Sequence, residues 1–194
     1  MKNKPIRILI VEDDLDFCYL IKNTLESQND FLVVGECQNA ESAIVSAGNL
    51  HPDIVLMDLN LSTTNLDGID AGRQIRLMTD AKIIILTAFE DPEIVITACV
   101  QSFASAYIFK SQFGILSETI RNTSKGDTPQ QFLIHSAILS CLSSAENSVF
   151  DVMLGKPLEL QSSAKTIANQ KTSILKKLGL ASQKELIHIF SDKH

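Results

Sequence analysis

Charged and hydroxyl side chains stand at the ends of short apolar runs in the first half of the chain. Glu12 and Asp13 follow the first run, and Asp58 follows the third. Thr87 ends the fourth run and Lys110 follows the fifth. Carboxylates that gather in one place repel each other unless cations balance them, and such oxygens are the ligands that Mg²⁺ prefers. The pattern therefore indicates a site for a divalent cation and an anion, provided that the fold brings these residues together.

The apolar runs alternate with segments of helical periodicity. Each run is too short for a helix and continuous enough to be a strand buried on both faces. Pro92 suits the first turn of a helix that extends to about Phe103. This order predicts an α/β fold, a doubly wound five-stranded parallel sheet whose ligands bind at the carboxyl ends of its strands. The expected strands are 6–11, 31–34, 54–57, 83–86 and 106–109.

The second half shows no strand pattern. Its apolar residues recur at helical spacing, Ser143 to Glu146 form a capping box, and Gly179 suits a helix end. A run of turn-forming residues from Asn122 to Pro129 precedes it. We predict a small all-helical domain with four helical segments, near 132–142, 143–154, 163–178 and 182–190. The predicted division of the chain is a first domain at 1–122, a linker at 123–131 and a helical domain at 132–194.

Composition restricts the classes of protein to which the chain can belong. Its 194 residues are 45% hydrophobic and 21% charged, with net charge −6, as in a globular protein. Residues 1–126 carry 10 basic and 17 acidic side chains, whereas 127–194 carry 7 and 6. The sequence contains neither a signal-peptide pattern nor an apolar run long enough to span a bilayer, so we expect a cytoplasmic protein without a membrane partner. The scattered cysteines predict buried small side chains without zinc or disulfides; they are Cys18, Cys37, Cys99 and Cys141.

Over residues 5–122 the sequence resembles the receiver domain of bacterial two-component response regulators. The similarity lies in ILIVEDD at 8–14, DIVLMD at 53–58, DG at 67–68, LTA at 86–88 and YIFK at 107–110. Three positions depart from the family pattern. Ser62 stands in a loop that is longer than usual, where proline is common, Phe103 stands where glycine is common, and Ser111 replaces a frequent proline.

The resemblance implies a flavodoxin-like fold and a role for each site residue. Asp58 would accept a phosphoryl group in a Mg²⁺-dependent, self-catalysed transfer, and the protein would not be a turnover enzyme. Glu12 and Asp13 would hold Mg²⁺ with Asp58 and the backbone carbonyl of Asn60. Lys110 would pair with phosphoryl oxygens, Thr87 would hydrogen-bond the attached group, and Tyr107 would change position when Thr87 moves. The implied phosphoryl donor is a sensor histidine kinase.

Residues 143–190 resemble the LuxR/NarL-type helix-turn-helix output domain. The similarity lies in LSSAE at 142–146, KTI at 165–167 and SILKKLGLAS at 173–182. It implies a transcription regulator that dimerises on phosphorylation, in which Ser163 caps the recognition helix. The residues that would face DNA are Lys165, Asn169, Gln170, Lys171 and Lys176, and Lys177 would add a phosphate contact.

The output segment is shorter than the family pattern. Only six residues, with an internal Pro157, separate Gly155 from Ser162, too few for the first helix of the motif and its turn. Two alternatives therefore stay open. One is a signalling adaptor that binds protein through Leu186, Ile187 and Phe190, and the other is a phosphate sink without output.

Overall fold

The computed structural model of the protein describes residues 4–61, 66–126 and 128–191. The chain forms two compact units that divide after Ile134, three residues later than the predicted domain start. The predicted linker at 123–131 is largely helical, because α5 (Leu116–Lys125) continues into it and α6 (Pro129–Leu139) begins within it. Burial of Thr123 and capping of α6 by Thr128, whose hydroxyl accepts from the Gln131 N–H, explain why these turn-forming residues become helical.

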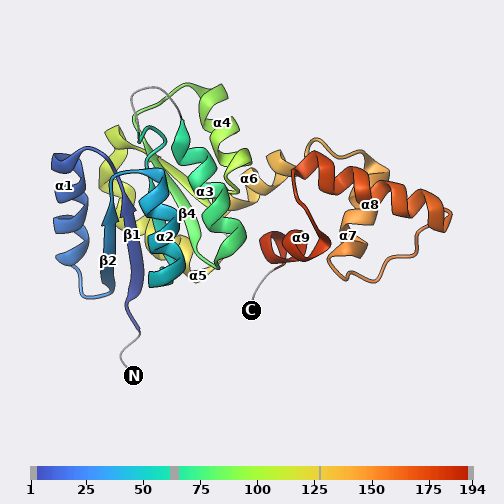
Figure 1. The fold of residues 1–194 in the computed structure, drawn as a ribbon, viewed down its shortest axis with the longest axis horizontal. Coiled ribbons are helices and arrows are strands. Elements are labelled where there is room, and N and C mark those ends of the chain that lie inside the picture. The colour runs from blue at the N-terminus through green and yellow to red at the C-terminus, as the bar shows by residue number, and fades with distance from the viewer. Residues whose placement is uncertain (1–3, 62–65, 127, 192–194) are drawn as a thin grey trace. The chain divides into compact units, whose positions relative to one another are not determined.

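The first unit contains the predicted five-stranded parallel sheet, with strand order β2-β1-β3-β4-β5 (Figure 1). Two strands are longer than predicted. The second gains three residues beyond Val34, and the fourth begins at Lys82 and ends at Thr87. The pairing of the first strand with the second shifts by one residue between Ile8 and Leu9, so the second strand has one extra residue there. The strands are β1 (Ile6–Val11), β2 (Phe31–Cys37), β3 (Ile54–Met57), β4 (Lys82–Thr87) and β5 (Ala106–Phe109).

Helices cover both faces of this sheet, as a doubly wound fold requires. One face packs against α1 (Leu15–Glu26) and α5, whose apolar side chains share a core with Ile8 and Ile10. The other face carries α2 (Ala40–Leu50), α3 (Asp67–Met78) and α4 (Pro92–Gln101) (Figure 1). A 3₁₀ helix, η1 (Lys110–Ile115), connects β5 to α5.

Phe103 lies in the connection between α4 and β5 and has a backbone conformation that glycine usually adopts. The predicted helix end near Phe103 is slightly late, because α4 stops at Gln101 and Phe103 has φ 53°. This left-handed region costs a residue with a Cβ roughly 1–2 kcal/mol. The Phe103 ring is buried and lies 4.5 Å from the Arg73 guanidinium, so its packing offsets the backbone cost.

The second unit is helical throughout its regular structure, as predicted. After the end of α6 it contains α7 (Ser144–Met153), α8 (Ala164–Leu178) and α9 (Gln183–Phe190). The capping box between Ser143 and Glu146 is present, and Gly179 ends α8 with φ 63°. The core of this unit consists of buried apolar side chains from these three helices, the end of α6 and the turns beside them: Ile138, Leu142, Val149, Phe150, Met153, Ile174, Leu178, Leu180, Leu186 and Ile189.

The cysteine prediction is right for three residues and wrong for one. Cys18, Cys37 and Cys99 are buried free thiols, whereas Cys141 is exposed. Cys141 lies in the turn after α6, where its thiol donates to the carbonyl of Ile138 instead of packing in a core. Across the described part of the chain, every helix is too short or too polar to cross a bilayer.

Candidate functional site

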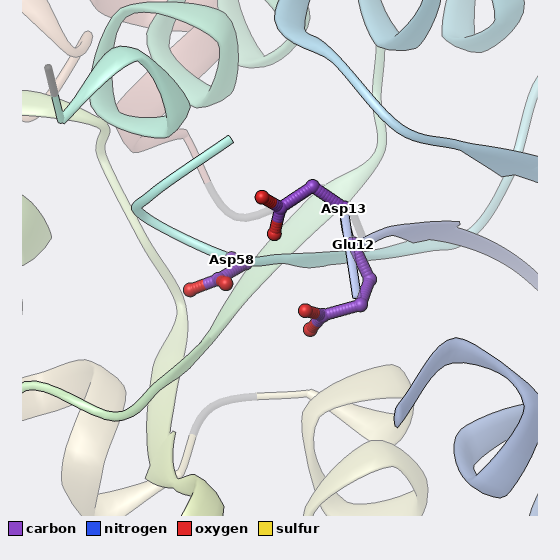
Figure 2. A group of neighbouring side chains, drawn as sticks. All are labelled: Glu12, Asp13 and Asp58. Atoms are coloured by element: carbon purple, nitrogen blue, oxygen red, sulfur yellow. The ribbon is translucent and has the colours of Figure 1, made fainter. Parts of the chain in front are cut away.

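Three carboxylates meet where β1 and β3 end. Glu12 and Asp13 follow β1, and Asp58 follows β3; each offers a ligand oxygen, and these oxygens lie within 4.8 Å of one another (Figure 2). The strands are neighbours in register, with Val11 opposite Met57, so the residues that follow them must lie side by side. Glu12 and Asp58 are buried, at 1% and 6% exposure, and Asp13 is exposed. The structure thus brings together the three acids expected to hold a cation.

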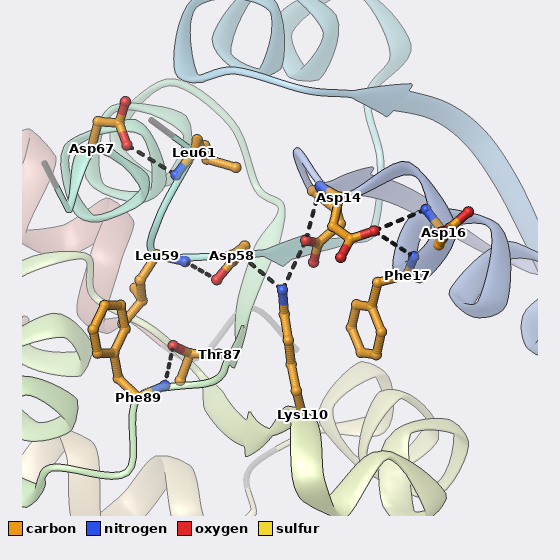
Figure 3. Close-up of polar contacts among 11 residues, drawn as sticks. Asp14, Asp16, Phe17, Asp58, Leu59, Leu61, Asp67, Thr87, Phe89 and Lys110 are labelled. Atoms are coloured by element: carbon orange, nitrogen blue, oxygen red, sulfur yellow. Dashed lines mark hydrogen bonds and ion pairs between the residues drawn. The ribbon is translucent and has the colours of Figure 1, made fainter. Parts of the chain in front are cut away.

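Lys110 places a positive charge between two of these carboxylates. Its Nζ donates to Glu12 Oε1 at 2.8 Å and to Asp58 Oδ2 at 2.9 Å (Figure 3). Burial raises the pKa of Glu12 to about 6, an effect that Lys110 opposes and Asp58 reinforces. Burial lowers the pKa of Lys110, but hydrogen bonds to the two carboxylates outweigh it and leave that pKa raised. Lys110 is therefore a cation held in place by the acids that it neutralises.

The loop after Asp58 passes close to α3. The Leu59 N–H donates to Asp58 Oδ1 at 2.7 Å, and a Cβ on Gly68 would lie 2.0 Å from the Asp58 carbonyl oxygen. This close approach explains why glycine follows Asp67 here. Asn60, expected to offer its backbone carbonyl to the cation, is exposed. Ser62, on which the expectation of a longer loop rests, lies outside the described residues.

Thr87 and Tyr107 lie on adjacent strands without being opposite each other. Thr87 is fully buried at the end of β4, and its Oγ1 accepts from the Phe89 N–H at 3.1 Å (Figure 3). Its partner in β5 is Phe109, while Tyr107 pairs with Ile85. Tyr107 is half-buried with its ring edge-on to Phe109 at 5.6 Å. Thr87 therefore lies at the end of its strand, beside the site. Tyr107 lies two residues before the residue of β5 that pairs with Thr87.

Two contacts at this end of the sheet were not predicted from the sequence. The ring of Phe17 lies 4.7 Å from Lys110 Nζ, a contact that no motif in the sequence indicates. The side-chain amide of Gln130 pairs with the backbone of Tyr107, accepting from its N–H at 3.2 Å and donating to its carbonyl at 3.1 Å. Gln130 lies in the predicted linker, where no motif distinguishes it.

The expected DNA-facing residues of α8 separate into two groups. Lys165, Asn169 and Lys176 are exposed, and their spacing places them on one face of the helix. Gln170 and Lys171 are half-buried, and the Gln170 side-chain oxygen is buried without a hydrogen bond among the described residues. Gln170 and Lys171 are therefore less accessible to DNA than the other three residues, because the helix turns them toward its own unit.

The ammonium of Lys177 is bound within the helical unit, although 39% of the side chain is exposed. Its Nζ lies 2.6 Å from Glu146 Oε2, and the same carboxylate also accepts from Ser173 Oγ and the Ser143 N–H. These hydrogen bonds, that from Lys177 first, lower the pKa of Glu146 to about 2. The contacts join α7 to the second half of α8, so the Lys177 ammonium is already paired with a carboxylate of its own unit.

The first helix of the helix-turn-helix motif would stand between α7 and α8. The described segment 154–163 contains no helix, as the short spacing predicted. Within the described segment 161–173, which includes the first half of α8, every side chain is exposed or half-buried. Ile174 and Leu178 anchor only the second half of α8. The unit thus presents the N-terminal half of α8 without a supporting helix.

Comparisons with known proteins agree with this geometry. Residues 8–121 match the family model of the response regulator receiver domain. The transcriptional regulatory protein LiaR of Bacillus subtilis is 34% identical over 147 residues, covering 74% of this chain and 68% of LiaR. YdfI of the same organism is 27% identical over 210 aligned residues, covering 96% of each chain. A crystal structure of a LuxR-family regulator from Aurantimonas matches with TM-score 0.59 and 28% identity, over 70% of this chain and 96% of that one. The chain belongs to the response regulators, with residues 8–121 as its receiver domain.

Proposed function

We propose that the protein is a two-component regulator that is phosphorylated on Asp58 and controls transcription through its helical unit. The observation that carries the proposal is the placement of Lys110 Nζ 2.9 Å from Asp58 Oδ2, beside the carboxylates of Glu12 and Asp13. A carboxylate nucleophile, a fixed cation for the phosphoryl oxygens and a cluster of oxygen ligands are the groups that phosphoryl transfer needs. A sensor histidine kinase would be the physiological donor.

The chain's own residues position the reaction. An Asp58 carboxylate oxygen attacks the phosphorus atom, and the bond to the donor's leaving group breaks as the acyl phosphate forms. Lys110 neutralises oxygens of the arriving phosphoryl group, and the Thr87 hydroxyl hydrogen-bonds that group once it is attached. We propose that Tyr107 follows the movement of Thr87 along the neighbouring strands.

The acidic cluster fits Mg²⁺ by the chemistry of its donors. All three groups offer oxygen, two are buried, and the single ammonium of Lys110 contacts only Glu12 and Asp58, so the cluster keeps negative charge for a cation. We propose that Glu12, Asp13 and Asp58 hold the ion together with the backbone carbonyl of Asn60. When bound, Mg²⁺ supplies positive charge that neutralises the phosphoryl oxygens.

Phosphorylation is tested by measuring the intact mass of the protein after incubation with acetyl phosphate. Asp58→Asn should abolish the gain of one phosphoryl group, and excess chelator should prevent it in the natural chain. Asp53→Asn is a matched control, because Asp53 is exposed at the opposite end of β3. Equal labelling of the Asp58→Asn variant would contradict the proposal.

For the output we propose DNA binding by the exposed face of α8, with phosphorylation favouring a homodimer. The relatives LiaR and YdfI are transcriptional regulatory proteins by name, and Lys165, Asn169 and Lys176 offer two cations and one amide on a common face. Cations can neutralise DNA phosphates and an amide can pair with a base edge. The protein would work in the cytoplasm, as the unpaired cysteines suggest.

Salt dependence tests the output. Lys165→Ala and Lys176→Ala should each weaken DNA binding and reduce the slope of log affinity against log salt by about 0.9. Lys184→Ala is the matched control, an exposed lysine on α9. Asn169→Ala should cost roughly 1–3 kcal/mol on a preferred site and little on random DNA. Absence of binding at low salt, with and without phosphorylation, would refute DNA binding.

The adaptor alternative is not favoured by the structure of α9. Leu186 is buried, and Phe190 is half-buried with its ring 5.2 Å from that of Phe150. Of the three residues expected to form an apolar docking face, only Ile187 is exposed. The face needed by that alternative is used in the unit's own core.

A further inference from the structure

We propose that Phe17 is a positioning residue for phosphoryl transfer, because its ring holds the Lys110 ammonium between Glu12 and Asp58. The inference rests on the proposed function and adds a residue that offers no polar group to the reaction. Lys110 Nζ lies 4.7 Å from the centre of the Phe17 ring and within 3 Å of both carboxylates. Figure 3 shows the ring beside the end of the Lys110 side chain.

The ring is fixed by two elements. Phe17 lies in the first turn of α1, where its N–H donates at 3.1 Å to the capping carboxylate of Asp14. Its ring meets Phe113 edge-on, with centroids 5.5 Å apart and an interplanar angle of 64°. Phe113 belongs to η1, the segment that begins at Lys110. The aromatic pair thus connects the helix that follows the metal-binding acids to the segment that carries the lysine.

This arrangement restricts a side chain that is otherwise mobile. An ammonium on a flexible four-carbon stem can leave its partners for water, and the Lys110 side chain is 20% exposed. The face of an aromatic ring attracts a cation within about 6 Å, and the attraction strengthens as water is excluded. The two carboxylates bind two sides of the ammonium, and the ring closes a third. Without the ring, the ammonium would spend less time where a phosphoryl group arrives.

The test compares Phe17→Leu with Phe17→Tyr. Leucine keeps an apolar side chain but removes the ring face, so labelling of Asp58 by acetyl phosphate should slow about fivefold, equivalent to about 1 kcal/mol. Tyrosine keeps the ring face and should restore the rate. The affinity for Mg²⁺, measured by calorimetry, should be unchanged in both variants. In proton NMR, the upfield ring-current shift of the Lys110 ε-methylene should be lost with leucine and kept with tyrosine.

Phe31→Leu is a matched control for the loss of a ring. The Phe31 ring also carries a cation, the Arg121 guanidinium at 4.8 Å, but lies on β2 away from the acidic cluster. Its loss should lower the melting temperature without slowing labelling. An unchanged labelling rate in Phe17→Leu, or equal slowing in Phe17→Leu and Phe31→Leu, would overturn the inference while leaving Asp58 as the acceptor. Failure of the natural chain to become labelled would overturn the proposed function itself.

Discussion

Replacing Gln130 by alanine should loosen the attachment of α6 to the sheet. β5 is an edge strand, so its backbone groups on the side away from β4 need partners other than a neighbouring strand. At Tyr107 the Gln130 amide supplies both, with hydrogen bonds of 3.2 and 3.1 Å. A side-chain amide has the same donor and acceptor as a peptide group, so Gln130 extends the sheet by one residue.

The magnitude follows from the two bonds. Each neutral hydrogen bond contributes about 0.5–1.5 kcal/mol net, so Gln130→Ala should lower the free energy of local opening at Tyr107 by about 1–3 kcal/mol. At 1.4 kcal/mol per factor of ten, exchange of the Tyr107 amide hydrogen should accelerate by about 5- to 150-fold. Gln130→Glu keeps the acceptor and loses the donor, so it should show roughly half of this free-energy change.

Hydrogen–deuterium exchange with residue resolution provides the assay. Gln74→Ala is the control, since Gln74 is an exposed glutamine on α3 and its loss should leave Tyr107 protected. Exchange in the rest of β5, at residues whose amides bond to β4, should change little. Unaltered exchange at Tyr107 in Gln130→Ala would show that the amide pairing does not hold α6 in place.

Two further predictions concern acid stability and the lifetime of the phosphoryl group. Lys177 and the N–H of Ser143 help to lower the pKa of Glu146 to about 2, so the helical unit should lose stability as the pH falls from the unfolded-state pKa of about 4.3 toward 2. Melting curves by circular dichroism should show this loss, and Glu146→Gln should be less stable at neutral pH and insensitive over that range. Phe89, which is half-buried beside Thr87, should exclude water from the phosphoryl group. Phe89→Glu should therefore accelerate loss of phosphate, and unchanged or slower decay would refute this role.

The sheet was predictable because burial on both faces produces uninterrupted apolar runs. This signal located all five strands and the residues that follow them, so Glu12, Asp58 and Lys110 could be expected at one edge. It failed where polar residues continue a strand, as at Glu36 in β2. Phe103, two residues after the end of α4, adopts the left-handed conformation that the usual glycine would allow.

Contacts that depend on side chains far apart in sequence could not be predicted. Lys177 was counted among the cations available to DNA, but its partner Glu146 is 31 residues earlier and is reached only when α7 packs on α8. Phe17 shares a helical spacing with the buried Ile21 and Leu25, but its contact with Lys110 depends on the path of η1. Periodicity reports which face of an element is buried, and not which neighbour meets it there.

The location of the phosphoryl group tests the central claim most directly. After incubation with acetyl phosphate and Mg²⁺, reduction with borohydride converts an aspartyl phosphate to homoserine, and peptide mass spectrometry identifies the position. We expect homoserine at position 58, with Asp13 and the other aspartates intact and no hydroxynorvaline, the corresponding reduction product of a glutamyl phosphate, at Glu12. Homoserine at another position, or stable phosphate on a hydroxyl side chain with position 58 unmodified, would contradict the assignment of Asp58 as the acceptor.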